Sequence, residues 1–168
     1  MPRKEKIHDM FNSIAADYDK LNHIMSLDID RTWRKRALRR ILKSTRDERR
    51  AGREIDEKRR LRSIEVLDVA CGTGDFSIAI AEAMRKLAKE SSESGKADAM
   101  GHVTGVDLSE GMLEVMKDKV AKAGLEDLIS CETGDCENLR FQDSSFDRVT
   151  VAFGVRNFEN REKGLREM

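Results

Sequence analysis

The chain is organised around the stretch Ser63-Ile64-Glu65-Val66-Leu67-Asp68-Val69-Ala70-Cys71-Gly72-Thr73-Gly74. Its first part, as far as Ala70, is rich in aliphatic and β-branched residues, which predicts a strand. Gly72 and Gly74 interrupt that pattern. After them, apolar residues recur at helical spacing and predict an amphipathic helix: Phe76, Ala79, Ile80, Ala83, Met84 and Leu87. The glycines therefore lie in a strand-to-helix turn.

Further strands and helices alternate along the rest of the chain. Strands are predicted at 102–107, 128–133 and 146–153. Helices are predicted at 31–43, at 109–123 with Ser109 as N-cap and Gly124 as terminator, and from Asn160 onward. Four strands that alternate with helices are typical of a parallel α/β sheet.

Composition excludes several classes of protein. The 168 residues suffice for one domain, and 32 basic residues balance 32 acidic ones. With no net charge, the chain has no global field for nucleic acid, so a general nucleic-acid binder is excluded. Three cysteines without paired spacing argue against a disulfide framework or a zinc site, and the three histidines do not form a ligand set.

Two segments interrupt the α/β pattern and resemble insertions. Residues 46–60 hold seven basic and five acidic side chains, which favours a solvated helix or loop over a basic patch for lipid or a partner. Residues 90–101 are rich in serine, glycine and alanine and predict a loop. No apolar run is long enough to span a bilayer and the N-terminus is not a secretory signal, so the expected location is the cytoplasm.

Polar groups gather where the predicted strands end. Open α/β sheets bind ligands at this edge. The turn at Gly72 lets a ligand approach the backbone and precedes a helix N-terminus that attracts anions. Asp107 ends the second strand, where a carboxylate can accept both hydroxyls of a ribose, and the polar run 134–137 follows the third strand, where it can read an adenine edge. The glycines alone are also compatible with a tight turn that binds no ligand. Together with the strand before them, the helix after them and Asp107, they favour a nucleotide site.

The residues after the turn discriminate between nucleotides. The dinucleotide fingerprint has a third glycine, where this chain has Ser77, and a phosphate-binding Gly-Lys-Ser/Thr motif is missing. Asp75 would repel a pyrophosphate but would attract an ammonium group. These features favour S-adenosylmethionine, whose methionine end carries an ammonium and a carboxylate.

Three segments resemble the ubiquinone/menaquinone biosynthesis C-methyltransferase family, which includes demethylmenaquinone methyltransferases. They are Phe11-Asn12-Ser13-Ile14-Ala15-Ala16-Asp17-Tyr18-Asp19, continuing through Asn22 and Ser26 to Trp33-Arg34; Asp68 to Asp75, with Ala70 where motif I of class I methyltransferases often has glycine; and Phe146-Asp147 with Phe153-Gly154-Val155-Arg156-Asn157. The resemblance implies a Rossmann-like class I methyltransferase sheet, incomplete here at about four strands, and an N-terminal helical segment.

The same resemblance implies three parts of the chain and two sets of site residues. The parts are an N-terminal substrate-side or lid segment (1–45), a charged insertion (46–62) and an S-adenosylmethionine-binding domain that stops before its last strands (63–168). The implied cofactor-binding residues are Asp68, Gly72, Thr73, Gly74, Asp107, Leu108, Asp135, Cys136 and Phe153. The substrate-side candidates, without an assigned base, are Tyr18, Asp19, Asn22, Arg156 and Asn157.

The implied activity is transfer of a methyl group from S-adenosylmethionine to a ring carbon of a polyprenyl quinol, such as demethylmenaquinol. The lipidic substrate implies peripheral contact with the inner face of a membrane through Phe11, Ile14 and Tyr18, and the open edge of an incomplete sheet favours a homodimer. Two alternatives stay open: a methyltransferase for another phenol or a sterol, and an inactive fragment that serves only cofactor binding or association.

Overall fold

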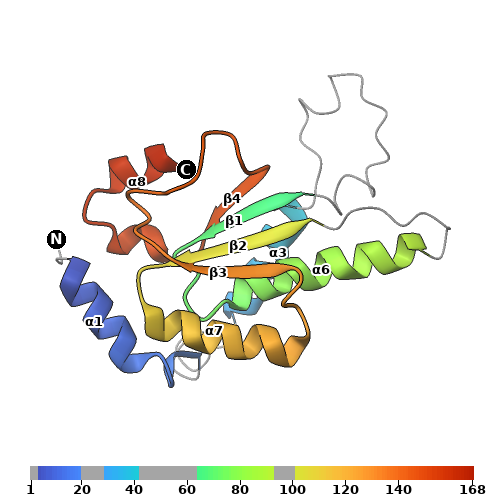
Figure 1. The fold of residues 1–168 in the computed structure, drawn as a ribbon, viewed down its shortest axis with the longest axis horizontal. Coiled ribbons are helices and arrows are strands. Elements are labelled where there is room, and N and C mark those ends of the chain that lie inside the picture. Colours follow the sequence, from blue (N-terminus) through green and yellow to red (C-terminus); the bar gives the residue numbers. More distant parts are fainter. Residues whose placement is uncertain (1–3, 20–28, 42–63, 93–100) are drawn as a thin grey trace.

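The computed structural model describes residues 4–19, 29–41, 64–92 and 101–168. Its centre is a four-stranded sheet in the order β3-β2-β1-β4 (Figure 1). The strands are β1 (Glu65–Val69), β2 (His102–Asp107), β3 (Ile129–Thr133) and β4 (Arg148–Val151). Every pairing is parallel, which confirms the predicted parallel α/β class.

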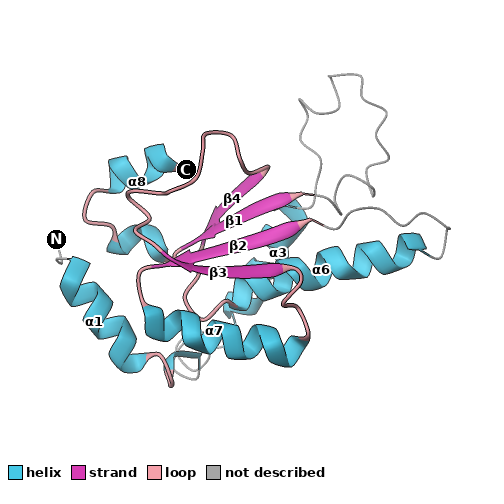
Figure 2. Ribbon diagram, in the orientation of Figure 1, coloured by secondary structure: helices cyan, strands magenta, loops and turns pink. Residues whose placement is uncertain are grey.

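Helices flank the sheet, and the first and the last of them lie toward one of its ends (Figure 2). They are α1 (Lys4–Ile14), α3 (Ile29–Ile41), α6 (Asp75–Ser92), α7 (Glu110–Ala123), the 3-10 turn η1 (Gly154–Asn157) and α8 (Arg161–Glu167). The apolar stripes of α6 and α7 pack on one face of the sheet around Ile80, Met84 and Met116, which are fully buried. A second apolar cluster, which includes Leu67, Val106 and Phe158, belongs to the other face.

The strand register brings the polar strand ends together. Val69 is level with Val106 of β2 and with Val151 of β4, and Asp107 is level with Thr133 of β3. All four strands run in the same direction, so the segments that follow them emerge at one edge of the sheet. The N-terminal helix α1 and the turn η1 lie at this end (Figure 1).

Strand and helix ends differ from the predictions by a few residues. α6 extends to Ser92 and so into the predicted loop 90–101, and β4, predicted at 146–153, is limited to Arg148–Val151. Phe146 packs edge-on against Phe141 instead, and Phe153 has a left-handed backbone with φ of 64° that ends the extended run. The caps of α7 are confirmed: the Ser109 side chain accepts from the Met112 N–H, and Gly124 is left-handed. The charged stretch 46–60 lies outside the described residues, and the three-part division stays a prediction.

Asp68 joins three elements inside the fold. Its carboxylate is 1% exposed and accepts hydrogen bonds from the Ser77 hydroxyl of α6 at 2.6 Å and the Thr150 hydroxyl of β4 at 2.8 Å. Burial raises the pKa of Asp68 to about 6, although both hydroxyls favour the charged form. The side chain therefore ties the strand before the glycine turn to its neighbours.

Replacing Gly74 by alanine is expected to destabilise the fold more than the same change at Gly124. Both glycines have positive φ, which costs an alanine about 1–2 kcal/mol. A Cβ at Gly74 would also lie 2.4 Å from Cγ of Met116, whereas a Cβ at Gly124 meets nothing within 4 Å. Overpacking adds roughly 1–3 kcal/mol. Urea unfolding of both variants measures the difference in the free energy of unfolding. Equal losses of stability would show that α7 moves to accommodate the added methyl group.

The stability of the chain is expected to carry a pH dependence from Asp68. The folded pKa is raised, so the folded state holds this proton more tightly, and the stabilisation is largest below the ordinary pKa of 3.8 and is lost as the pH rises to about 6. A shift of this size corresponds to roughly 3 kcal/mol. Unfolding of the wild type and of Asp68→Asn at pH 4 and pH 7 measures it, with Asp118→Asn, on the exposed face of α7, as the control. The Asp68→Asn variant should gain relative to the wild type at pH 7; a pH-independent difference would contradict the assignment.

Candidate functional site

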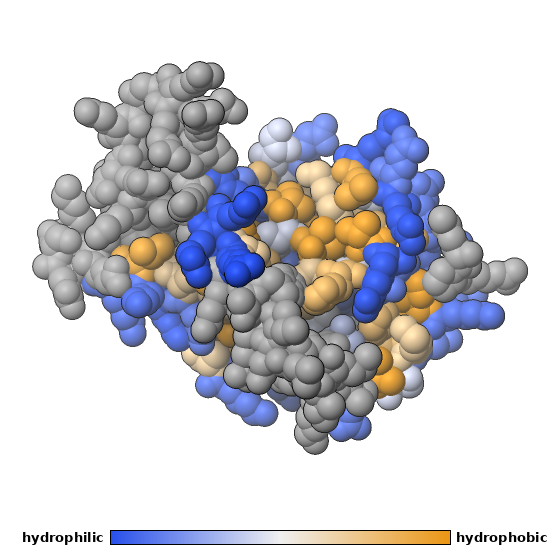
Figure 3. Space-filling view, turned by 180° about the vertical axis from the view of Figure 1, so that it is seen from behind, coloured by the Kyte–Doolittle hydropathy of each residue, from blue (hydrophilic) through white to orange (hydrophobic). Residues whose placement is uncertain are grey.

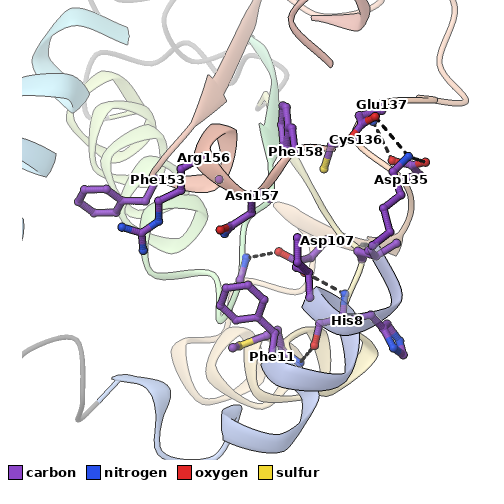
Figure 4. Close-up of a pocket in the computed structure, with 18 of the residues that line it drawn as sticks. His8, Phe11, Asp107, Asp135, Cys136, Glu137, Phe153, Arg156, Asn157 and Phe158 are labelled. Atoms are coloured by element: carbon purple, nitrogen blue, oxygen red, sulfur yellow. Dashed lines mark hydrogen bonds and ion pairs between the residues drawn. The ribbon is translucent and has the colours of Figure 1, made fainter. Parts of the chain in front are cut away.

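A pocket lies at the carboxyl ends of the strands, between the sheet and α1 (Figure 4). The space between its walls, with the open mouth included, is about 760 Å³. Nine of the predicted site residues line it: Tyr18, Gly72, Asp107, Leu108, Asp135, Cys136, Phe153, Arg156 and Asn157. The tertiary structure thus brings together residues from both ends of the chain.

Asp107 holds two loops of the pocket together. One carboxylate oxygen accepts the Gly72 N–H at 2.8 Å, and the other accepts the Ser109 N–H at 2.9 Å. Burial raises the pKa of Asp107, and these backbone donors oppose the rise. An ionised carboxylate has about four acceptor positions, so capacity remains for hydroxyl groups of a ligand. The Gly72 N–H is already engaged by Asp107.

The backbone beside Asp107 is held in unusual conformations. Ala70 and Phe153 have φ of 52° and 64°, and Gly72 has 57°. A Cβ on Gly154 would lie 2.4 Å from Cβ of Ala70, whereas a Cβ on Gly72 would meet no protein atom within 4 Å. The ends of β1 and β4 are therefore packed closely, while the space at Gly72 stays open. Strained backbone that the fold maintains is typical of ligand sites.

The segment after β3 forms the opposite wall. Asp135 and Glu137 share Lys4 of α1, whose ammonium lies 2.7 and 3.3 Å from them. Burial acts to raise the pKa of Asp135, but the hydrogen bond and charge of Lys4, together with the Glu137 N–H and the charge of Lys163, outweigh it, and the pKa lies below its ordinary value. Burial raises the pKa of Cys136 to about 12, so its thiol stays neutral. The Cys136 side chain therefore offers an apolar surface beside a charged rim.

Aromatic side chains stand at the mouth of the pocket. Phe153 is 58% exposed, and the Arg156 guanidinium lies 5.8 Å from its ring centroid. On the side of α1, Phe11 and Tyr18 meet edge to face at 5.9 Å between centroids. In Figure 4, Asn157 lies between Arg156 and Asp107, with Phe11 below it. Polar groups and flat apolar surfaces thus face the same space, as a ligand with an aromatic ring requires.

Several predicted site residues lie away from this pocket. Asp68 is buried behind the turn, and Thr73, which is 3% exposed, donates its hydroxyl to Asp19 at 2.5 Å. Gly74 packs against the Met116 side chain. None of these four residues (Asp68, Thr73, Gly74 and Asp19) lines the pocket. They support the turn from the side that faces away from it. Asn22 lies outside the described residues.

Asp75 does not lie free for a ligand ammonium, contrary to the sequence-based interpretation. Its carboxylate pairs with Lys119 of α7 and, at 2.7 Å, with Arg34 of α3. Burial opposes its ionisation, but the two cations outweigh this effect and its pKa lies below the ordinary value. Lys119 also reaches Asp19 at 2.8 Å. This network joins the start of α6 to α3, α7 and the N-terminal segment.

Three residues that line the pocket were not predicted as site residues: Lys4, His8 and Phe158. Glu137 also lines it, and the sequence placed this residue in the polar run 134–137 without a sign of its burial. Glu137 is 4% exposed and accepts the Glu159 N–H at 2.7 Å, which fixes the chain before α8. A charged residue in a polar run carries no signal of burial, so only the tertiary contacts identify it. The N-terminal residues carried no signal because their partners lie about a hundred residues away.

Comparison with known proteins identifies the family. A model of the ubiE/COQ5 methyltransferase family matches residues 2–168. The chain is 40% identical over 166 residues to a demethylmenaquinone methyltransferase of Bacteroides fragilis, with 99% of this chain and 55% of the relative covered. It is 38% identical to a ubiquinone/menaquinone biosynthesis C-methyltransferase of Geobacter sulfurreducens, with 98% and 52% covered. The chain thus spans about half the length of the curated relatives that it matches.

Solved structures share the fold. The YcgJ protein of Bacillus subtilis is 25% identical with a TM-score of 0.51, over 63% of this chain and 38% of its own. A putative S-adenosylmethionine-dependent methyltransferase of Methanococcus maripaludis, 24% identical, matches 63% of this chain and 42% of its own with the same TM-score. These findings confirm the Rossmann-like architecture and the resemblance seen in the three sequence segments. The chain belongs to the ubiE/COQ5 methyltransferase family.

Proposed function

We propose that this chain binds S-adenosylmethionine in the pocket at the carboxyl ends of its strands and contributes to C-methylation of a quinol ring. The observation that carries the proposal is the partly buried Asp107 carboxylate, which lines the pocket beside the open space at Gly72. A carboxylate at the end of the second strand of such a sheet is suited to a ribose. Family membership supports the same reading.

The pocket residues fit the parts of this cofactor. Asp107 would accept the ribose hydroxyls with its remaining acceptor positions. Asp135 and Cys136 would flank the adenine, where the neutral thiol offers an apolar surface. Gly72 leaves room for the methionine end, and the network of Asp75 with Lys119 and Arg34 would hold the turn in place from behind.

The remaining wall is suited to an aromatic acceptor. When bound, S-adenosylmethionine supplies an activated methyl group. The task of the protein is then alignment, which supplies on the order of 7–11 kcal/mol in favourable cases. Tyr18, Arg156 and Asn157 line the pocket and would orient the hydroxyl groups of the ring. Phe11 and Phe153 would cover its faces and limit the access of water.

The proposed acceptor is a polyprenyl quinol such as demethylmenaquinol. The relative in Bacteroides fragilis is named for demethylmenaquinone methylation, and the one in Geobacter sulfurreducens for ubiquinone and menaquinone biosynthesis. Transfer of labelled methyl from S-adenosylmethionine to demethylmenaquinol, with a simple phenol and a sterol as competing acceptors, compares the substrate classes. Cofactor binding without transfer to any acceptor would favour a binding module.

Asp107→Asn is expected to weaken the binding of S-adenosylmethionine about 10- to 100-fold. The amide offers one acceptor atom where the carboxylate has two, and its NH₂ group faces a backbone donor, so one N–H loses its partner. Isothermal titration calorimetry measures the affinity. Asp118→Asn makes the same chemical change on the exposed face of α7 and should bind as the wild type does. Equal affinities of wild type and Asp107→Asn would overturn this use of the pocket.

Contact of α1 with a membrane surface is also part of the proposal. Among the described residues, no helix is long and apolar enough to cross a bilayer, so a lipidic acceptor would be reached from the surface. Met10 of α1 is 48% exposed, whereas Phe11 and Tyr18 line the pocket. These exposures support Met10, rather than Phe11 and Tyr18, as the outward apolar contact.

Met10→Glu is therefore expected to reduce co-sedimentation with liposomes that contain anionic lipid, because a charge replaces the exposed apolar side chain. The neighbouring exposed change Ser13→Ala serves as the control. Unchanged binding of Met10→Glu would remove α1 as the contact.

Self-association through the sheet edge stays a proposal. β4 is one of the two edge strands of the described sheet, and its Val149 is 36% exposed. Apolar residues lie together on the surface in the view from behind (Figure 3). An edge strand offers unpaired backbone groups to a second chain, which supports a homodimer formed there.

A further inference from the structure

Asn12 of α1 contacts the loop that carries Asp107. Its side-chain oxygen accepts the Gly111 N–H at 2.9 Å and the Ser109 hydroxyl at 2.5 Å. The Gly111 N–H belongs to the first turn of α7, where backbone donors have no partner within the helix. Asn12 therefore caps α7 from a position 99 residues earlier in the chain.

Ser109 transmits this contact to Asp107. Its hydroxyl donates to Asn12 and accepts from the Met112 N–H at 3.2 Å, so both of its directions are used. The backbone N–H of the same residue donates to Asp107 at 2.9 Å. A change at Asn12 releases the Ser109 side chain, and with it the loop that orients one oxygen of the Asp107 carboxylate.

Both helices are shaped for this contact. A Cβ at Gly111 would lie 3.0 Å from the Asn12 side-chain oxygen and 3.5 Å from Cβ of Ala15, and Ala15 is 6% exposed. Beside them, His8 of α1 lies 2.7 Å from Glu110 of α7. The two segments approach closely only because Gly111 and Ala15 are small. Helices that touch loosely would not need small residues at these positions.

The same helix forms one wall of the pocket. His8 and Phe11 lie on α1 and face the pocket, with Asp107 above them (Figure 4). Asn12 thus connects two things: the position of α1 against the pocket and the orientation of the carboxylate inside it. When one contact serves both, ligand binding and the docking of α1 stabilise each other by the same free energy.

We infer that Asn12 is a positioning residue that couples the docking of α1 to the orientation of Asp107 and so to ligand binding. The inference rests on the proposed function, because S-adenosylmethionine is the ligand whose binding it strengthens. Asn12 itself does not line the pocket; it acts through Ser109.

Calorimetric titration with S-adenosylmethionine tests the inference on four forms of the chain. Asn12→Ala removes the acceptor and should weaken binding about 10-fold, as expected for the loss of a buried hydrogen bond. Asn12→Asp keeps both acceptor contacts and places a negative charge at the N-terminus of α7, where it is favoured. Its second oxygen replaces the amide nitrogen that lies 3.1 Å from His8 and hydrogen-bonds Glu110, so this variant should bind closer to the wild type than to Asn12→Ala. Ser13→Ala changes the next, exposed residue of α1 and should have no effect.

Hydrogen exchange in residues 4–14 provides a second readout. Ligand should slow exchange there in the wild type and in Asn12→Asp, and should do so much less in Asn12→Ala. A loss of this ligand effect distinguishes a positioning role from a general loss of stability. Circular dichroism of each variant monitors the stability. If Asn12→Ala does not fold, Asn12→Ser replaces it, because its shorter side chain cannot reach both donors, and the same loss of affinity is expected.

The outcomes separate the two proposals. A wild-type chain that does not bind S-adenosylmethionine contradicts the proposed function. A wild type that binds, together with Asn12→Ala of equal affinity, or with Asn12→Asp as weak as Asn12→Ala, overturns the positioning role and leaves the proposed function intact.

Discussion

The site depends on one carboxylate that bridges two loops. Asp107 ends β2, yet it accepts the N–H of Gly72 after β1 and the N–H of Ser109 before α7. Without it, the two strand-to-helix turns would have unpaired backbone donors beside a pocket. An interaction of this kind is strong because a charged acceptor meets two backbone donors in a partly buried place. It also sets the edge of the space that a ligand would fill.

Close packing of the strand ends supplies the second constraint. Gly154 lies against Ala70, and both Ala70 and Phe153 keep a left-handed backbone. Such conformations cost free energy and persist only where the surroundings hold them. Here Asp68 anchors β1 to α6 and β4 through two hydroxyls. The buried Asp68 side chain thus connects the strand before the turn to its neighbours, while the other side of the turn faces the pocket.

The N-terminal segment is integrated into this arrangement by charge and capping. Lys4 reaches the loop after β3, Asn12 caps α7, and Asp19 meets Thr73 and Lys119. Each contact is part-exposed, and a single exposed ion pair contributes little. Their distribution along one segment matters more, because it holds that segment against the pocket at several points.

The sequence by itself determined the parallel sheet, the glycine turn and the caps of α7. Their signals are local: periodicity, two glycines, and Ser109 with Gly124. It also predicted that Asp107, the segment after β3 and the Phe153 segment share one edge, since parallel strands end together. Only the tertiary structure decided that Asp68 and Thr73 lie behind the turn, that Asp75 is held by Lys119 and Arg34, and that Asn12 reaches Ser109. Burial and partners depend on contacts between distant residues, and a sequence pattern carries no distance between them.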